Sequence, residues 1–360
     1  MPTQPRTVLY TLFALAVIAS LGSSAFADPP SLEIEGAIRS DILFRRQDSG
    51  KIQDDMNSSE TYLRLSSDLS RFVRVAVAFE LDRDLRENGR WTEQSKLSIE
   101  ELLREASIEI HDVGGVPVAF VIGKQEIAFG QAVTAMPAFT RGALYETQTI
   151  NRVLGLTVRL DKTVLGIIQS IEASAFSSET DSRLSHGSIG KIDSASVRVK
   201  GEIFEGLQFS VSAAHLGNKH LGSDSTEQRY SVGLIYTDPK GVWKTWIEGL
   251  YHADKNNPRY GENAHFGITA GALRRAGPGD VVAEVSWIQN VMTEVGIGYR
   301  LLVTPNVTVG PEVRLIRWQN TGSESRNDLR VGIVLEILLG GATLSPEDEV
   351  LFGAKKERQK

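Results

Sequence analysis

Cysteine is absent from the 360 residues of this sequence. Its absence excludes disulfides, thiolate metal sites and cysteine nucleophiles together, so packing and backbone pairing alone must hold the fold. Positive charge is not in excess either, because 39 Lys and Arg residues face 45 Asp and Glu residues, for a formal net charge of -6. An acidic chain of this kind argues against nucleic acid as a partner.

Long hydrophobic runs are almost absent. The one clear run, Val8 to Ala19, follows Arg6, the only charge in the first 27 residues, and precedes the small-x-small pattern Ala25 to Ala27. This order is typical of a cleaved secretory signal, and the run is well short of the ~20 residues that a spanning helix needs. We therefore expect residues 1–27 to be removed on export, so that the mature chain begins at Asp28.

Alternation of apolar and polar residues takes the place of long apolar runs. Mean hydropathy is -0.14, a value that looks soluble, but a membrane β-barrel hides its signal because lipid-facing and water-facing residues alternate along each strand. Phe72 to Leu81, Leu207 to His215 and Asp328 to Leu339 each place aliphatic residues on one face and polar residues on the other. These are period-2 strands with one apolar face.

We count about sixteen such runs, and the connections between them alternate in length. Gln47 to Glu60 and Gly130 to Asn151 are long, whereas Ser70-Arg71 and Glu205-Gly206 are short. Outer-membrane barrels have short periplasmic turns and longer outer loops, and an even strand number returns both termini to the periplasm. Trp287 to Thr293 is short where a long loop is expected, which leaves the count open by one hairpin. The runs begin near residues 32, 61, 72, 104, 116, 152, 165, 192, 207, 227, 242, 262, 279, 291, 307 and 328.

A soluble β-sandwich is the alternative architecture, since its strands also alternate. Sandwich strands average about 5 to 6 residues, whereas most runs here have 9 to 13, the length that crosses a bilayer at a tilt. We therefore predict an all-β fold, a transmembrane antiparallel up-and-down β-barrel of about 16 strands with a water-filled lumen, over residues 28–340. Residues 341–360 are predicted to be a periplasmic C-terminal tail that offers a handle to a periplasmic partner.

Charged residues recur on the predicted inward face of the strands. Each of them singly is explained as part of the solvent-exposed polar face of a sheet. Burying so many charged side chains away from water would be very costly, so as a set they indicate a water-filled channel. Because both signs are present, we expect weak selectivity and predict no sign. The predicted pore-lining residues are Arg64, Arg74, Glu109, Arg159, Arg198, Lys200, Arg229, Lys244, Arg300, Arg314 and Arg330.

A predicted hairpin precedes the longest connection. Ser107 to Phe129 consists of two alternating runs joined by a tight turn at Gly114-Gly115. The loop behind it, Gly130 to Asn151, is predicted to enter the lumen, because loops of this length in compact domains are usually functional. A disordered outer loop is the alternative. The predicted constriction residues are Lys124, Glu126, Arg141, Tyr145 and Glu146.

Catalytic patterns are not found. The six histidines show no metal spacing, and no G-x-S-x-G, H-E-x-x-H or P-loop pattern occurs. Some outer-membrane barrels are hydrolases, so a surface triad is the alternative, but we expect neither an enzyme nor a metal or other cofactor.

The segment LREASIEIHDVGGVPVAFVIGKQEIAFGQ is similar to one in the siderophore-porin family and related phosphate-selective and general porins, E-A-x-I-x-L, a turn, then V-G-K/R-Q-x-x-P-F-G. The matching residues are Glu105, Ala106, Ile108, Gly123, Lys124, Gln125, Phe129 and Gly130, while Ala128 replaces the usual proline. The resemblance covers about residues 32–176. It implies a 16-stranded outer-membrane porin for small solutes, commonly a homotrimer. One departure is the ending Gln359-Lys360, where such barrels usually end on an aromatic residue.

The sequence leaves three functions open. The leading one is a porin for passive diffusion of small hydrophilic solutes across the bacterial outer membrane, with both termini in the periplasm. The second is a specific uptake channel for a siderophore or an oxyanion. The third is a barrel that sheathes another protein such as a multihaem cytochrome, with residues 343–360 as the docking handle. Conductance of the purified protein would separate the first from the third.

Overall fold

The computed structural model describes residues 31–47, 52–57, 61–81, 84–87, 90–91, 103–112, 115–130, 150–164, 166–177, 192–217, 226–254, 265–304, 306–319 and 326–340. The predicted signal segment, residues 1–27, and the predicted tail, residues 341–360, lie outside this part of the chain.

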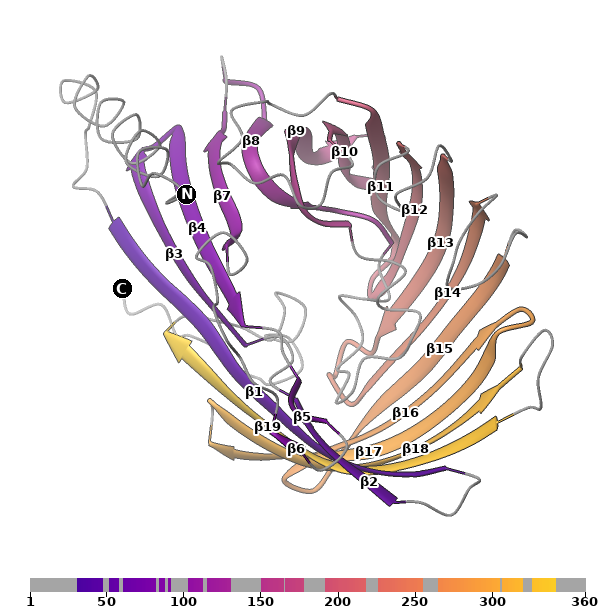
Figure 1. The fold of residues 1–360 in the computed structure, drawn as a ribbon. Coiled ribbons are helices and arrows are strands. Elements are labelled where there is room, and N and C mark those ends of the chain that lie inside the picture. The colour runs from indigo at the N-terminus through magenta and orange to yellow at the C-terminus, as the bar shows by residue number, and fades with distance from the viewer. Residues whose placement is uncertain are drawn as a thin grey trace, which may run out of the picture.

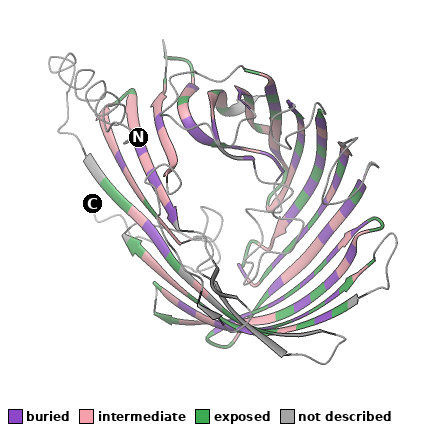
Figure 2. Ribbon diagram, in the orientation of Figure 1, coloured by how far each residue is buried: buried purple, intermediate pink, exposed green. Residues whose placement is uncertain are grey.

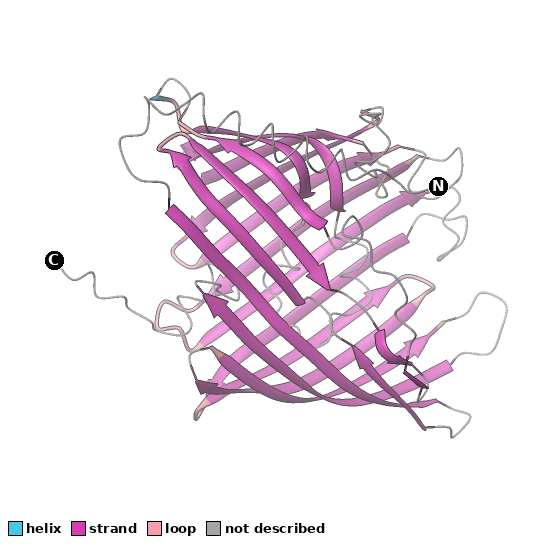
Figure 3. Ribbon diagram, turned by 60° about the vertical axis from the view of Figure 1, so that its left-hand side comes forward, coloured by secondary structure: helices cyan, strands magenta, loops and turns pink. Residues whose placement is uncertain are grey.

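Nineteen strands form one antiparallel sheet, and sixteen of them make the wall of a closed barrel (Figure 1). The first strand, β1 (Ser31–Gln47), pairs with the last, β19 (Arg326–Gly340), from Glu35 opposite Gly340 to Gln47 opposite Asp328. This pairing removes the two free edges that an open sheet would have. Figure 3 shows the strands running obliquely around the wall, as closure of a sheet into a barrel requires.

The other wall strands follow one another in chain order around the barrel. They are β3 (Thr61–Ser70), β4 (Val73–Leu81), β7 (Leu103–Ile110), β8 (Val118–Ile127), β9 (Ile150–Val164), β10 (Ile168–Phe176), β11 (Ser194–Phe204), β12 (Leu207–Leu216), β13 (Glu227–Thr237), β14 (Trp243–Asp254), β15 (His265–Ala276), β16 (Gly279–Ile288), β17 (Met292–Thr304) and β18 (Val307–Trp318).

Three short strands extend the wall next to β1. β2 (Ile52–Asn57) pairs with the C-terminal half of β1. β5 (Asp84–Glu87) pairs with β2 and also with β6 (Arg90–Trp91). Because β1 pairs with β3 through its N-terminal half, this extension lies at the barrel end that carries the long connections.

The predicted strand count is confirmed, and each wall strand begins within three residues of its predicted start. The doubtful connection, Trp287 to Thr293, joins β16 and β17 directly, and no hairpin was miscounted there. Val291 N–H donates to the Ile288 carbonyl at 3.1 Å in that turn, and Asn290 has a φ of 58°. Asparagine is one of the few residues that tolerate this left-handed conformation.

The connection predicted as a tight turn at Gly114-Gly115 is longer than two residues. Gly115 N–H does donate to the Asp112 carbonyl at 3.1 Å, while Gly114 lies outside the described residues. β7 ends at Ile110 and β8 begins only at Val118, with Ile110 opposite Phe120 as the last residue pair. The alternating pattern continued past the end of the paired residues, and alternation alone does not say where pairing stops.

Within β8, Gly123 has a φ of 130°, and a Cβ there would lie 2.2 Å from the Ala106 carbonyl oxygen. Only glycine permits this close approach of β8 to β7.

The outer surface of the barrel is apolar. Val232 on β13 is 60% exposed and Ile297 on β17 is 56% exposed, whereas Ser231, next to Val232, is 1% exposed. Figure 2 shows exposed and buried residues alternating along the C-terminal strands. A soluble sandwich is therefore excluded, because its aliphatic rows would face each other and be buried.

Aromatic residues lie near both ends of the outer surface. Tyr230 and Tyr251 pair across β13 and β14 with ring centroids 6.2 Å apart. At the other end of β14, the Arg274 guanidinium lies 4.6 Å from the Trp243 ring centroid. Two such girdles are typical of barrels that cross a membrane. No helix among the described residues is long and apolar enough to span a bilayer.

The outward position of Val232, at the middle of β13, predicts a large cost for a charge there. Val232→Arg should lower the free energy of unfolding in lipid vesicles by about 2–4 kcal/mol, because the guanidinium would enter hydrocarbon. Val232→Leu, the matched control, should change it by less than about 1.5 kcal/mol. Denaturant unfolding followed by tryptophan fluorescence measures both. Equal stability of the two variants would show that this face does not contact lipid.

Candidate functional site: the luminal wall

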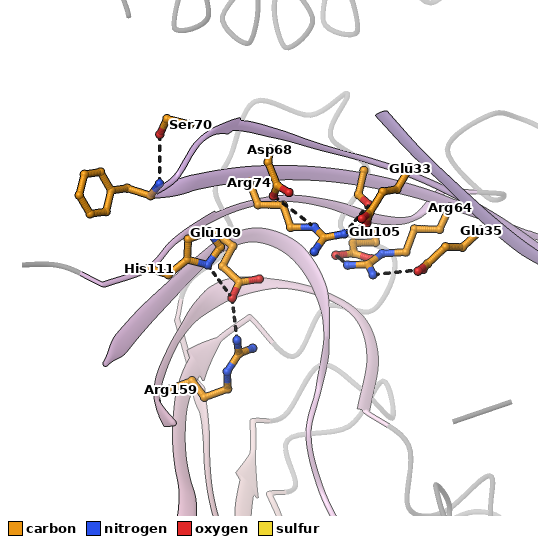
Figure 4. A network of polar contacts seen from close by, with 12 residues as sticks. Glu33, Glu35, Arg64, Asp68, Ser70, Arg74, Glu105, Glu109, His111 and Arg159 are labelled. Carbon is orange, nitrogen blue, oxygen red and sulfur yellow. Dashed lines mark hydrogen bonds and ion pairs between the residues drawn. The ribbon is translucent and has the colours of Figure 1, made fainter. Parts of the chain in front are cut away.

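Arginines on the inner face of the N-terminal half lie between carboxylates of neighbouring strands. On β3, Arg64 donates from Nε to Glu105 Oε2 of β7 at 3.0 Å, and its Nη1 lies 3.6 Å from Glu35 Oε2 of β1. On β4, Arg74 contacts Glu33 of β1, and its Nε lies 3.9 Å from Asp68 Oδ1. Figure 4 shows these two arginines side by side, each held by carboxylates.

The pattern continues on the next strands. Arg159 of β9 donates from Nη2 to Glu109 Oε1 of β7 at 2.7 Å and also contacts Asp161. Glu109 in turn lies 3.4 Å from His111 Nδ1 (Figure 4). Both contacts are made by the same oxygen, Glu109 Oε1, so this carboxylate is held between β9 and the residue that follows β7.

Two further arginines extend the same wall. Arg104 of β7 contacts Glu80 of β4 at 2.9 Å and also Glu126 of β8. Arg198 of β11 contacts Glu172 of β10 through Nη2 at 2.8 Å. Ion pairs of this cross-strand kind hold adjacent strands in register.

A cavity of about 250 Å³ opens on this wall. Its lining combines both signs of charge with the neutral hydrogen-bonding groups of Ser107, Gln125 and Thr157, and Thr157 donates to Gln125 Oε1 at 3.1 Å. The lining residues are Arg64, Arg74, Ala76, Glu105, Ser107, Glu109, Val121, Gln125, Glu126, Ala128, Thr157, Arg159 and Glu172. A lining this polar suits water and hydrophilic solutes rather than an apolar ligand.

The inner face of the C-terminal half is buried instead. Arg314 of β18 lies among three carboxylates: Glu284 of β16 at 2.8 Å, Glu294 of β17 at 2.7 Å, and Glu312 of its own strand. All four side chains are at most 6% exposed. One guanidinium therefore uses its Nε and both Nη groups to neutralise part of a dense carboxylate cluster.

A second buried cluster lies on β13 and β14. Arg229 donates to Glu227 at 2.5 Å, and His252 Nδ1 lies 3.1 Å from the same carboxylate. All three side chains are at most 9% exposed. The arginines of the opposite wall have side chains up to 33% exposed, so water reaches the inner surface unevenly.

Residues Ala128 to Gly130 leave β8 and cross the lumen. The Gly130 N–H donates to Ser212 Oγ of β12 at 3.0 Å, and Arg198 Nη1 donates to the Gly130 carbonyl at 3.3 Å. Gly130 has a φ of 71°, and a Cβ there would lie 2.5 Å from Glu248 Oε1 of β14. The segment thus reaches the wall formed by β11 to β14, and glycine is required where it touches that wall.

Phe129 anchors this crossing in an apolar cluster inside the barrel. The cluster joins β8, β9 and β10 to β12, β14 and β16 to β18, near the end with the long connections. Its buried members are Ile127, Phe129, Ile150, Val153, Phe176, Ala214, Leu216, Leu250, Ile288, Met292 and Ile316. We call this cluster, together with residues 128–130, the luminal bridge.

The predicted site residues fall into three groups. Arg64, Arg74, Glu109, Glu126 and Arg159 line the cavity. Others lie on the wall outside the cavity lining. Lys124 is buried beside the cavity, and β11 carries Arg198 and the half-buried Lys200. Four are at most 5% exposed, namely Arg229, Lys244, Arg300 and Arg314, and Arg330 on β19 is half-buried. Arg141, Tyr145 and Glu146 lie outside the described residues.

Several lining residues were missing from the predicted site, notably Glu172, Thr157 and Ser107. Strand parity places each of them inward, and Glu172 is also opposite Arg198 in the register of β10 and β11. No sequence pattern predicted the burial of Phe129, because this residue stood out only as one of the residues that match the porin-like segment. Among the described residues, no group of three or more His, Asp or Glu side chains is arranged to hold a metal ion.

No protein-family model matches the sequence, and no curated protein matches it significantly. Solved structures do match. The outer-membrane channel DcaP of Acinetobacter baumannii is 13% identical with a TM-score of 0.57, over 86% of this chain and 97% of that one. OprB of Pseudomonas putida is 11% identical with a TM-score of 0.57, over 86% and 94%. The trimer form of OmpT, an outer-membrane protein of Vibrio cholerae, is 12% identical with a TM-score of 0.54, over 87% and 100%.

The chain has the fold of outer-membrane channel proteins. Identities of 10 to 13% establish the shape of the barrel and nothing about the solute, since one fold hosts many functions. The barrel architecture predicted from sequence is therefore confirmed, while the likeness to the siderophore-porin family in particular stays a prediction.

The buried cluster around Arg314 predicts a strong dependence of stability on that residue. Arg314→Met should cost about 3–5 kcal/mol of unfolding free energy, because three buried carboxylates would lose their common partner. Arg317→Met is the matched control, since Arg317 lies on the same strand but is exposed, and it should change stability by about 0.5 kcal/mol or less. Denaturant titration in vesicles measures both. Equal effects would mean that the carboxylates are hydrated.

Proposed function

We propose that this protein is a porin of the bacterial outer membrane that allows passive diffusion of small hydrophilic solutes. The observation that carries the proposal is the pairing of two surfaces on one closed sheet. The outside is apolar, with Val232 at 60% exposure, and the inside carries ionised groups around a cavity of about 250 Å³. Only a barrel with hydrocarbon outside and water inside gives both surfaces a suitable solvent.

The arrangement of the strand ends supports an orientation of the barrel in the outer membrane. β1 starts and β19 ends at the same rim, because Glu35 pairs with Gly340. The short turns, such as the one at Glu205-Gly206, lie at that rim too. In bacterial outer-membrane barrels this rim faces the periplasm, and the predicted N-terminal signal would deliver the chain there. We place both termini in the periplasm on this basis, and a homotrimer remains our expectation.

The luminal bridge supplies the constriction. Residues 128–130 and the cluster around Phe129 fill part of the interior near the long connections. Solutes would therefore pass along the half of the wall where Arg64, Arg74 and Arg159 are partly exposed. The charged groups along this path are held by fixed ion pairs, which suits transient contact with solutes rather than tight binding.

Single-channel recording in a planar lipid bilayer tests the proposal. The purified protein should give stepwise open currents, and Val121→Trp should reduce them because Val121 lines the cavity. Ile122→Trp is the control, since the next residue on β8 is 50% exposed on the outer surface. A barrel that inserts but stays silent and copurifies with haem would favour the sheath and overturn the porin.

The anchoring of the bridge predicts a second effect on conductance. Phe129→Ala removes packing of the kind that contributes about 3–5 kcal/mol in buried clusters, so the segment should loosen and the open current should rise. Phe120→Ala is the control, since Phe120 lies on β8 two residues from the outward-facing Ile122, and it should leave the current unchanged. If the two variants conduct alike, the segment does not narrow the path.

A further inference from the structure

We infer that the lumen selects for small cations, inorganic ions and organic molecules bearing an ammonium group alike. The inference rests on the proposed channel and gives it a solute class. The observations that carry it are the balance of charge around the cavity and the exposure of the two signs. Both come from the tertiary pairing of the strands, since the sequence alone showed only a lining of mixed sign.

Carboxylates outnumber guanidinium groups around the cavity. Each of Arg64, Arg74 and Arg159 lies between two carboxylates, and the other two arginines each contact at least one. The charged lining residues and their ion-pair partners are five arginines, Arg64, Arg74, Arg104, Arg159 and Arg198, and eight carboxylates, Glu33, Glu35, Asp68, Glu105, Glu109, Glu126, Asp161 and Glu172. Among these described residues the excess is three negative charges.

The two signs are also unequally exposed. Side chains of Glu33, Asp68, Asp161 and Glu126 are 48%, 45%, 50% and 39% exposed. None of the five arginines exceeds 33%. The other four carboxylates, Glu35, Glu105, Glu109 and Glu172, are 13% to 29% exposed. The four most exposed charged side chains of the set are therefore all carboxylates.

A row of arginines would by itself suggest an anion path, but most donors of Arg64 and Arg198 are engaged. Arg64 gives Nε and Nη2 to the two oxygens of Glu105. Arg198 gives Nε and Nη2 to Glu172 and Nη1 to the Gly130 carbonyl. A passing anion would have to break these charge-assisted bonds and approach the exposed carboxylates, whereas a cation is attracted without displacing anything.

The shape of the barrel strengthens this preference. A charged lining between low-dielectric walls concentrates the field inside the lumen and raises the local concentration of counter-ions. Salt screens the effect, because the Debye length falls from about 10 Å at 0.1 M to about 3 Å at 1 M. Cation preference should therefore be marked in dilute salt and weak in concentrated salt.

Reversal potentials measured across a bilayer with a gradient of KCl test the inference on the full-length purified protein. A several-fold preference for K⁺ over Cl⁻ is expected in dilute salt, with a decline as salt rises. In vesicles, diaminobutane should enter faster than succinate, an anion with the same number of carbons. Channels that open but prefer Cl⁻, or that show no preference in dilute salt, would overturn the inference and leave the channel itself intact. Absence of any current would instead overturn the proposed function.

The exposed carboxylates provide the decisive variant. The double change Glu126→Gln and Asp161→Asn removes two of the three excess negative charges and should bring the permeability ratio close to one. The control Glu205→Gln neutralises an exposed carboxylate on the turn between β11 and β12, outside the lumen, and should retain the ratio. A ratio unchanged by the double variant, with open currents preserved, would show that these side chains do not set the preference.

Discussion

Closure of the sheet by β1 and β19 is the constraint on which the rest of the structure depends. A strand that faces hydrocarbon has no water for its N–H and C=O groups, so an open edge there is prohibitively costly. Glu35 to Gln47 pair with Gly340 to Asp328 along the full contact between the two strands. Once the ring is closed, every residue along a strand must face either outward or inward, and the two environments differ completely.

This division explains why the outer surface is simple and the inner one is not. Outward residues need only be apolar, and Ile297 and Ile333 are accordingly exposed at 56% and 54%. Inward residues must satisfy one another. They do so through cross-strand ion pairs on β1, β3, β4 and β7 to β11, through the cluster around Glu227 on β13 and β14, and through the cluster around Arg314 on β16 to β18.

The interior of the barrel is divided into two parts because one short segment, residues 128–130, leaves the wall and enters the lumen. Where β8 ends, Phe129 enters an apolar cluster and Gly130 binds Ser212 of β12 and Arg198 of β11. The cluster joins opposite parts of the barrel, so the half-buried arginines and exposed carboxylates remain on the N-terminal strands around the cavity. On this wall the four most exposed charged side chains, Glu33, Asp68, Glu126 and Asp161, are all carboxylates.

The sequence by itself determined the class of fold, the number of wall strands and the face to which most side chains point. Alternation has a period of two, and closure leaves no third environment, so Val232 and Arg64 could each be placed from the pattern alone. It did not determine where pairing ends, as the turn after Ile110 shows. Only the tertiary structure decided which inward-facing charged side chains form ion pairs with one another and which remain exposed to solvent. Arg64 contacts Glu105 from 41 residues away and Phe129 packs on distant strands, because barrel closure and the inward segment bring together residues that no local pattern relates.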